Sequence, residues 1–394
     1  MTVHLPRDEQ EAGAIILEAA SRRSPVFIMG GGTKADLGRP AQSEATVSSS
    51  ALTGITLYEP AELVIAAKAG TPVSEVTRTL AGKGQELPFE PMDYRPLLGS
   101  RGEPTIGAVA AANLSGPRRI MAGAARDSLI GVRFVNGRGE AVKSGGRVMK
   151  NVTGLDLVKL MAGSWGTLGL LTEVTFKVLP KAERTATLII RGLDDHTAIE
   201  VLSSALSSPF EVSGAAHVPA VDRQGGQTLL RIQGFSVSVD YRASELRRLF
   251  TRLGTADLIE GRAGDAVWQS VRDATLLAEP RDRAVWRIST TPTKGPDLVA
   301  RIARSLDARW FYDWGGGLIW LATEPSGDAG AAVLRSALRD VGGHATLVRA
   351  PAEIRASVDV FEPQDETVMR LTAGLKAAFD PKGILNPGRM YAGI

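Results

Sequence analysis

The first part of the chain alternates between the hydrophobic periods of helices and strands. Apolar residues at helical spacing predict a helix over residues 10–23, and the short apolar run 25–29 predicts a buried strand. A second apolar run, 63–70, predicts another strand. We expect the next helix to be capped by Thr71, with Pro72 at its first position, because these residue types are typical of helix starts.

Two β-type segments follow in the same region. Residues 131–145 predict a hairpin with Asn136 and Gly137 at its turn, and residues 170–180 predict a strand that ends at Pro180. Strands and helices therefore alternate as far as about residue 181.

The pattern changes after this point. From Thr185 to about Val360, apolar strands such as "ATLIIRGL" and "LIWLAT" alternate with helices such as "RASELRRLFTRLG", which predicts a separate α+β domain around an antiparallel sheet. The final residues, "FDPKGILNPGRMYAGI", are rich in Pro and Gly and predict a loop. We therefore divide the chain into residues 1–181, 182–360 and 361–394.

Composition narrows the class of protein. The length of 394 residues suggests two or three domains, and 44% hydrophobic with 23% charged residues is typical of a soluble globular protein. The net charge of +3, from 46 basic and 43 acidic residues, argues against a nucleic-acid partner. The absence of cysteine excludes disulfides, thiolate metal sites, iron–sulfur ligation and a cysteinyl flavin link. The charged N-terminus and the lack of any stretch of about 18 apolar residues lead us to expect a cytoplasmic protein without a transmembrane segment.

The most distinctive local sequence is "FIMGGGTKADLG". It lacks the first glycine of a phosphate-binding P-loop, and Gly38 and Pro40 interrupt the helix that a Rossmann fingerprint requires. An ordinary turn between strands is the alternative. Residues 30–32, however, place three glycine amides side by side, and such a concave surface accepts phosphate oxygens. We expect an unusual backbone angle at residue 31.

Two further segments have the small residues that close approach to a ligand requires. In "EPTIGAVAAANLSGPRR", residues 107–112 are small and apolar, Asn113 supplies an amide, and Arg119 adds charge. A small-residue helix packed on a sheet is the alternative interpretation. Farther along, glycines recur at three-residue steps at positions 163, 166 and 169.

Five motifs, taken in order, resemble those of the vanillyl-alcohol-oxidase-type FAD-binding flavoproteins. They are GGGT after a strand, T-I-G-x-x-x-A-x-N-x-x-G from Thr105, G-x-x-x-K-x-x-x-G-x-D-x-x-K-L from Gly146, G-S-x-G-T-L-G-x-x-T-E from Gly163, and D-P-x-G-I-L-N-P-G-R from Asp380. The resemblance implies an α+β fold with a two-subdomain, PCMH-type FAD-binding domain at 1–181. It also implies an α+β cap domain with an antiparallel sheet at 182–360, and a C-terminal segment, 361–394, that returns to the FAD domain.

The resemblance also implies where the cofactor lies. The pyrophosphate of FAD would be held through the backbone amides of Gly30, Gly31, Gly32 and Thr33, with Lys34 next in the loop. The ribityl and isoalloxazine part would be lined by Thr105, Ile106, Gly107, Asn113 and Gly116. The adenine side would be closed by Gly169 and Glu173, and Asn386 would bring the chain end back to the FAD domain. The expected cofactor contacts are completed by Pro91 and Arg118.

Covalent flavin links in this family usually use His or Cys. The chain has no Cys, and its histidines lie outside the flavin motifs, at His4, His196, His217 and His344. We therefore predict noncovalent FAD. We interpret His196 as a surface or capping residue, His217 as packed within a strand, and His344 as part of a structural turn.

The sequence lacks several residues that relatives use to oxidise a hydroxy acid. Relatives that oxidise D-2-hydroxy acids carry a paired-histidine metal motif in the cap, and here Asp313 and Trp320 stand at those positions, so we expect no metal. Trp165 and Leu155 replace a Glu and a Tyr that are frequent in such relatives. We assign no catalytic base. Candidates to hold a carboxylate, with surface or FAD-phosphate roles as alternatives, are Arg118, Arg119 and Arg126.

Within the family, the compact chain and "YDWGGGLIWL" resemble the FAD-linked subunits of bacterial glycolate oxidase. This resemblance implies a complex with a second FAD-linked glycolate oxidase subunit and an iron–sulfur subunit, a small 2-hydroxy acid substrate, and attachment to the inner face of the cell membrane through partner subunits. Three functions stay open: a subunit that supports oxidation of glycolate to glyoxylate, a self-sufficient flavin dehydrogenase of another alcohol or sugar acid, and a non-catalytic FAD-binding scaffold. The aromatic residues of the cap are interpreted as core, with a partner-facing patch as the alternative: Trp286, Trp310, Tyr312, Trp314 and Trp320.

Overall fold

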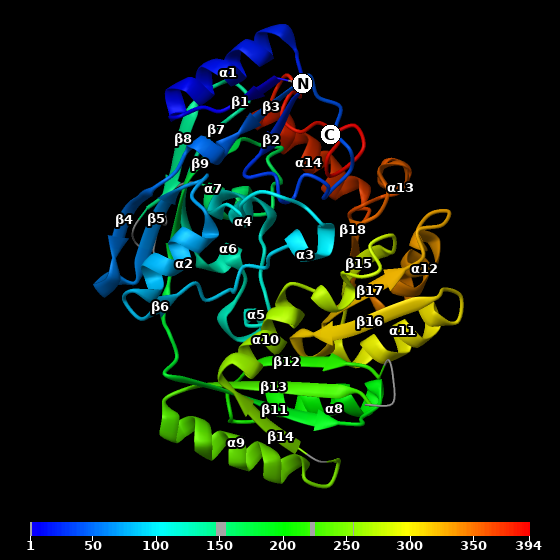
Figure 1. Ribbon diagram of the computed structural model, residues 1–394. Coiled ribbons are helices and arrows are strands. Elements are labelled where there is room, and N and C mark those ends of the chain that lie inside the picture. The colour runs from blue at the N-terminus through cyan, green and yellow to red at the C-terminus, as the bar shows by residue number, and fades with distance from the viewer. Residues whose placement is uncertain (1, 147–154, 221–224, 255) are drawn as a thin grey trace.

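The computed structural model describes residues 2–146, 155–220, 225–254 and 256–394 (Figure 1). Within these ranges the strands form four sheets. Two of the sheets, with their helices, make up the upper part of Figure 1, and the largest sheet makes up the lower part. The N- and C-termini lie near each other at the upper end. Lys150 and Gly154 of the third motif lie outside the described residues.

A small parallel sheet carries the glycine loop. Its strand order is β1-β3-β2, with β1 at Thr2–His4, β3 at Ala45–Ser48 and β2 at Val26–Met29. Helix α1 (Glu9–Arg22) starts at Asp8, whose side chain accepts the amide of Glu11 at 2.8 Å, and buries Ala12 and Ile16 against the strands. The predicted helix 10–23 and strand 25–29 are confirmed.

The second sheet is five-stranded and antiparallel, in the order β4-β5-β9-β7-β8. Its strands are β4 (Ile55–Glu59), β5 (Val64–Lys68), β7 (Leu129–Val135), β8 (Ala141–Gly145) and β9 (Leu170–Lys177). The predicted strands and hairpin are confirmed, but the turn spans residues 136–140 because Val135 pairs with Ala141. The predicted cap of the helix α2 (Val73–Ala81) is wrong, because Pro72 is its N-cap and the Thr71 hydroxyl bonds instead to the Gly54 backbone at 3.0 and 3.2 Å.

The small-residue run forms a helix on this sheet. Helix α4 (Ile106–Ala112) contacts β9 and β5, and a Cβ on Gly107 would lie 2.5 Å from the Ala69 side chain. The small residues therefore permit close packing, as the alternative interpretation proposed. The remaining elements of this part are η1 (Ser49–Ala51), η2 (Pro60–Glu62), α3 (Arg95–Leu98), α5 (Arg119–Ala122), α6 (Ala125–Ser128), α7 (Leu157–Met161) and the paired strands β6 (Gln85–Glu86) and β10 (Leu179–Pro180).

The largest sheet is antiparallel throughout, in the order β14-β11-β13-β12-β16-β17-β15-β18, which confirms the predicted sheet type. Its strands are β11 (Arg184–Arg191), β12 (Val212–Val218), β13 (Gln227–Gly234), β14 (Ala256–Glu260), β15 (Ala284–Ser289), β16 (Ala308–Asp313), β17 (Leu318–Thr323) and β18 (His344–Arg349). Its two halves meet where β12 pairs with β16 through His217 and Tyr312. All of these strands fall inside the range predicted for the cap, although the exact domain limits stay a prediction.

Helices cover the outer face of this cap sheet. They are α8 (Asp195–Leu206), α9 (Ser236–Phe250), α11 (Gly295–Ala303) and α12 (Ala331–Val341), while α10 (Gly261–Arg272) lies on the other face, toward the upper part of the molecule (Figure 1). Short turns η3 (Thr275–Leu277), η4 (Pro292–Lys294) and η5 (Trp314–Gly316) connect the strands. The chain then returns to the first part through α13 (Ala352–Ser357) and α14 (Glu366–Phe379).

The inner face of the cap sheet packs against the first part in one continuous core. Trp320 of β17 lies edge-on to Tyr94, with ring centroids 6.4 Å apart. Arg231 of β13 donates two hydrogen bonds to Glu90 at 2.7 and 2.8 Å. Trp286, Tyr312 and Trp320 are buried, which confirms the core interpretation for these aromatic residues. Contacts on this inner face therefore fix the position of the cap.

Candidate cofactor site

The glycine loop needs its glycines for different reasons. A Cβ on Gly31 would lie 2.0 Å from the Glu103 carbonyl oxygen, and one on Gly30 would lie 2.2 Å from Thr105 Oγ1. Gly32 alone of the three has a left-handed φ, 79°, and its Cβ position is open space. The unusual angle expected at residue 31 is therefore wrong: that glycine permits close packing on the 102–105 segment, and the turn occurs one residue later.

The loop is held by its carbonyl groups. Ser48 Oγ donates to the Gly30 carbonyl and Ser100 Oγ to the Thr33 carbonyl, both at 2.8 Å. The amides of Gly31, Gly32 and Thr33 have no acceptor anywhere in the described chain. Serine hydroxyls thus fix the loop while its donors stay available, which is the arrangement that a phosphate-binding nest requires.

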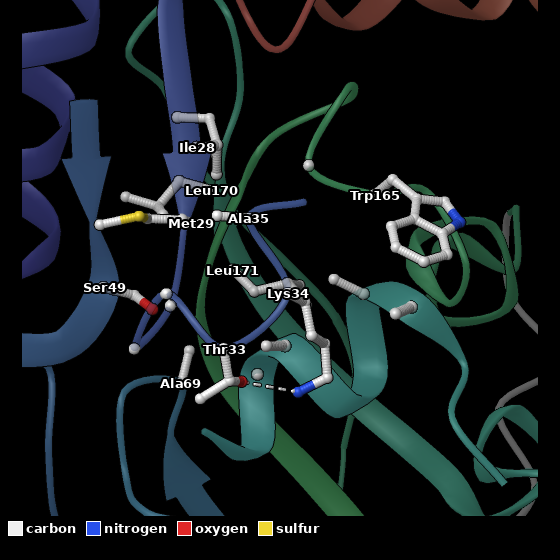
Figure 2. Close-up of a pocket in the computed structure, with 18 of the residues that line it drawn as sticks. Ile28, Met29, Thr33, Lys34, Ala35, Ser49, Ala69, Trp165, Leu170 and Leu171 are labelled. Atoms are coloured by element: carbon white, nitrogen blue, oxygen red, sulfur yellow. Dashed lines mark hydrogen bonds between the residues drawn. The ribbon is translucent and has the colours of Figure 1, made fainter. Parts of the chain in front are cut away.

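These amides border a pocket (Figure 2). Its other walls are Ala69, the small-residue side of α4, the 165–171 segment and Arg389. Figure 2 shows Lys34 extending from the loop toward α4, with Trp165 on the far side. The predicted contact residues that line this pocket are Gly30, Gly31, Gly32, Thr33, Lys34, Gly107 and Gly169.

Two buried cations face this pocket. Lys34 is 7% exposed, and its Nζ donates to Thr33 Oγ1 at 3.2 Å. Burial lowers the pKa of Lys34 to about 8, against the opposing effect of Asp93. Arg389 is 5% exposed, and its guanidinium lies 4.6 Å above the Phe27 ring. Burial, reinforced by Arg355, lowers the pKa of Arg389 to about 10.

Neither cation forms an ion pair with a described residue. Arg389 donates from Nη2 to the Lys34 carbonyl at 3.0 Å, but its Nε and Nη1 have no partner among the described residues. No carboxylate of those residues forms an ion pair with Lys34 either. Buried charges without partners are costly, and a diphosphate would neutralise both. The residues therefore fit the pyrophosphate of FAD. Sequence reasoning missed Arg389, although the quoted C-terminal motif ends on it.

Asn386 joins the chain end to both walls of the pocket. Its Oδ1 accepts the Ile28 amide at 2.8 Å, and its Nδ2 donates to the carbonyls of Ile28 at 3.2 Å and Trp165 at 2.8 Å. Trp165 has a φ of 54°, a rare value for a bulky residue. Asn386 thus lies behind the pocket and positions β2 and Trp165, and contact with the cofactor itself stays a prediction.

A second cavity adjoins the first and shares Ala112 and Trp165 in its wall. It lies between the end of α4 and the inner face of the cap sheet, and Asn113, Arg119, Arg287 and His344 face it. His344 is the first residue of β18, so its interpretation as part of a turn is wrong. Arg287 was not singled out from the sequence, because an arginine inside a β-type run carries no local signal.

The remaining predicted contacts lie outside the first pocket, and their roles stay predictions. Thr105 lies behind the glycine loop, where its buried Oγ1 has no partner in the described part of the chain. Ile106 is buried in the hydrophobic core, and Glu173 lies on β9. Gly116 packs against Glu90, and Pro91 is half-buried next to Glu90 in the sequence. Arg118 forms an ion pair with Glu86. Arg126 donates from Nε to the Lys159 carbonyl at 3.0 Å.

The positions compared with the paired-histidine motif carry no metal ligands that converge. Asp313 ends β16 and accepts the Trp314 amide at 2.7 Å, while Trp320 packs in the core. His196 is exposed, and His217 is buried 3.0 Å from Thr228 Oγ1 and 3.3 Å from Asp195 Oδ1. Among the described residues no group of three His, Cys, Asp or Glu side chains could hold a metal ion. Nor do those residues include a helix that is both long and apolar enough to cross a membrane.

Comparisons with known proteins agree with this arrangement. The family described as "FAD binding domain" matches residues 2–145. The chain is 35% identical over 375 residues to the glycolate oxidase subunit GlcE of Escherichia coli (strain K12), covering 95% of each chain. It is 25% identical over 429 residues to the glycolate oxidase subunit GlcD of Bacillus subtilis (strain 168), covering 98% of this chain and 88% of that one.

Among solved structures, the fold is similar to that of 4-ethylphenol oxidase from Gulosibacter chungangensis, with a TM-score of 0.73, 13% identity, and coverage of 99% of this chain and 89% of that one. Alkyldihydroxyacetonephosphate synthase gives a TM-score of 0.71 at 15% identity, with 98% and 75% covered. The match to the FAD binding domain family and the pocket lined by the glycine loop together identify the chain as an FAD-binding flavoprotein. The chain belongs to the family of FAD-linked oxidoreductases that includes the glycolate oxidase subunit GlcE.

Proposed function

We propose that this chain is the FAD-binding subunit of a glycolate oxidase-type complex, which supports oxidation of glycolate to glyoxylate. The observation that carries the proposal is the match to GlcE along 95% of both chains, together with a pocket whose two buried cations form no ion pair with any described residue. Its partners would be a second FAD-linked subunit and an iron–sulfur subunit. The complex would be cytoplasmic, associated with the inner face of the membrane through these partners.

In this proposal FAD is held noncovalently, and it supplies the acceptor for the hydride that leaves the hydroxyl-bearing carbon of the acid. The amides of Gly31, Gly32 and Thr33, with Lys34 and Arg389, hold the pyrophosphate. The small residues of α4 let the cofactor lie close to the helix backbone. Trp165 and the cap sheet form walls of the second cavity, beside the cofactor pocket.

A supporting role is preferred here to a self-sufficient dehydrogenase, because the resemblance places Asp313 and Trp320 where hydroxy-acid-oxidising relatives have the metal-binding histidine pair. A non-catalytic FAD-binding scaffold is the second candidate, and the same observation favours it. Both bind FAD. They differ in whether glycolate reduces the flavin once the partner subunits are added.

The test of cofactor binding compares three proteins by FAD titration: the wild-type chain, Arg389→Met, and Lys382→Met as a control. Lys382 is exposed in the same C-terminal segment. Loss of Arg389 removes a charge-assisted contact, so we expect about 10- to 100-fold weaker binding of FAD. Lys382→Met should bind like the wild type. Equal affinities for all three proteins would show that the pyrophosphate lies elsewhere.

A further inference from the structure

The second cavity contains a pair of arginines with an unusual environment. Arg119 of α5 and Arg287 of β15 both face it, and both guanidinium groups lie on the ring of Trp314, at 4.4 and 4.9 Å from its centroid. The ring is itself fixed, because Trp314 Nε1 donates to the Gly116 carbonyl at 3.0 Å. One rigid aromatic side chain therefore holds two cations at the same cavity.

Neither arginine is neutralised by the protein. In the described part of the chain, the side chains of Arg119 and Arg287 form no ion pair, and neither guanidinium donates a hydrogen bond. Both side chains are half-buried. Two fully buried arginines, by contrast, have partners: Arg231 bonds to the Glu90 carboxylate, and Arg355 donates to the Gly38 carbonyl at 2.9 Å. Within the described residues, Arg389 is the arginine whose fully buried donors lack a partner, and it lies at the cofactor pocket.

The charges in this cavity repel each other. Burial lowers the pKa of Arg287 most, and the proximity of Arg119 lowers it further. Burial also lowers the pKa of Arg119. The neighbouring Asp313 accepts the Trp314 amide, and burial raises its pKa to about 7, so it is an incomplete counter-charge at neutral pH. A small anion between the guanidinium groups would remove this cost.

We propose that the second cavity binds the carboxylate of a small acid substrate between Arg119 and Arg287, so that this chain recognises the acid itself. The inference rests on the proposed function, which supplies the acid and places FAD in the adjoining pocket. Guanidinium groups form paired hydrogen bonds with a planar carboxylate, and their aromatic platform limits their motion. Of the arginines considered from the sequence, Arg119 alone faces this cavity, because Arg118 pairs with Glu86 and Arg126 with the Lys159 carbonyl.

The test measures acid binding directly, without turnover. Tryptophan fluorescence of the purified chain, loaded with FAD, is titrated with glycolate, oxalate, glycolamide and inorganic phosphate. Binding beside Trp314 should change the emission. We expect glycolate and oxalate to bind, and the neutral glycolamide to bind at least 10-fold more weakly. Equal binding of glycolamide, or tighter binding of phosphate than of oxalate, would overturn the carboxylate assignment.

Three variants locate the site. Arg287→Met and Arg119→Met should each weaken oxalate binding about 10- to 100-fold, since each removes a charged donor. Arg309→Met is the control, because Arg309 is exposed on β16 of the same sheet. Unchanged oxalate affinity in both cavity variants would overturn the proposal. If a variant does not fold, the comparison of glycolate, oxalate, glycolamide and phosphate on the wild-type chain still tests the carboxylate assignment. The flavin spectrum of the wild-type chain separates the two ideas: bound FAD without acid binding refutes this inference alone, and a wild-type chain that binds no FAD refutes the proposed function.

Discussion

Replacing Asn386 by Ala should destabilise the first part of the molecule more than its position near the chain end suggests. The side chain makes three hydrogen bonds with the backbone of Ile28 and Trp165, and Asn386 is fully buried. Truncation leaves an amide and two carbonyls unpaired. At about 1–3 kcal/mol for each unsatisfied buried group, with partial relief from entering water, we expect a loss of about 3–5 kcal/mol.

The backbone angle adds a separate contribution. Asn386 has a φ of 44°, which Ala tolerates less well than Asn or Gly by about 1–2 kcal/mol. Asn386→Gly should therefore be less damaging than Asn386→Ala. Asn113→Ala is the matched control: its φ is 50°, but its side chain makes one exposed bond, from the Arg126 amide at 2.9 Å. We expect that control to cost about 1–2 kcal/mol.

Urea unfolding of the FAD-free chain, followed by circular dichroism, measures these free energies. FAD titration of the same proteins should show weaker binding for Asn386→Ala, because β2 and the Trp165 segment lose their common anchor. If Asn386→Ala lost less than about 1 kcal/mol, or no more than Asn113→Ala, the three-bond anchor would not stabilise the fold as argued.

Three further predictions concern charge. Glu90→Gln keeps the side-chain shape but leaves Arg231 buried without its carboxylate, so the free energy of unfolding should fall by about 3 kcal/mol in a thermal unfolding experiment. The control is Glu211→Gln, because the Glu211 side chain is 67% exposed; its free energy of unfolding should fall by less than about 1 kcal/mol. Lys376→Met removes three buried hydrogen bonds, to Asp380 Oδ2 and the carbonyls of Thr167 and Leu385; we expect a loss of about 3 kcal/mol, and an unchanged melting temperature would contradict the anchoring of α14. The affinity for FAD should fall as the pH rises above about 8, the pKa of Lys34, because the neutral amine must take up a proton before it can pair with phosphate. Below this pKa Lys34 is already protonated, and the affinity should not depend on its titration. Lys34→Met should remove the dependence between pH 7 and 9; a slope that persisted would assign it to another group.

Much of the fold follows from local sequence. The helix at 10–23 and the strands at 25–29 and 63–70 have clear hydrophobic periods and end at strong turn residues, so they were predictable. Thr71 shows the limit of such reasoning, because Gly54, seventeen residues away, competes for its hydroxyl. The small-residue run at 107–112 serves both interpretations, since α4 packs on the sheet with one side and lines the pocket with the other.

The site was predictable where it is made of backbone, and less so where it depends on distant side chains. The glycine loop and Lys34 are contiguous in the sequence and line one pocket. Arg389 reaches that pocket only because Asn386 fixes the chain end on β2, more than 350 residues away. Arg119 and Arg287 come together through packing of the cap on the first part, and no pattern within either segment indicates that contact.

The most direct test of the account is the visible absorption spectrum of the purified chain, recorded after FAD is supplied and again after acid precipitation. We expect one FAD per chain, released into the supernatant by acid, and a flavin that glycolate leaves oxidised under anaerobic conditions until the partner subunits are added. A yellow pellet would contradict noncovalent binding, and bleaching by glycolate alone would make the chain a self-sufficient dehydrogenase. A colourless chain would show that the glycine loop, Lys34 and Arg389 do not form an FAD site.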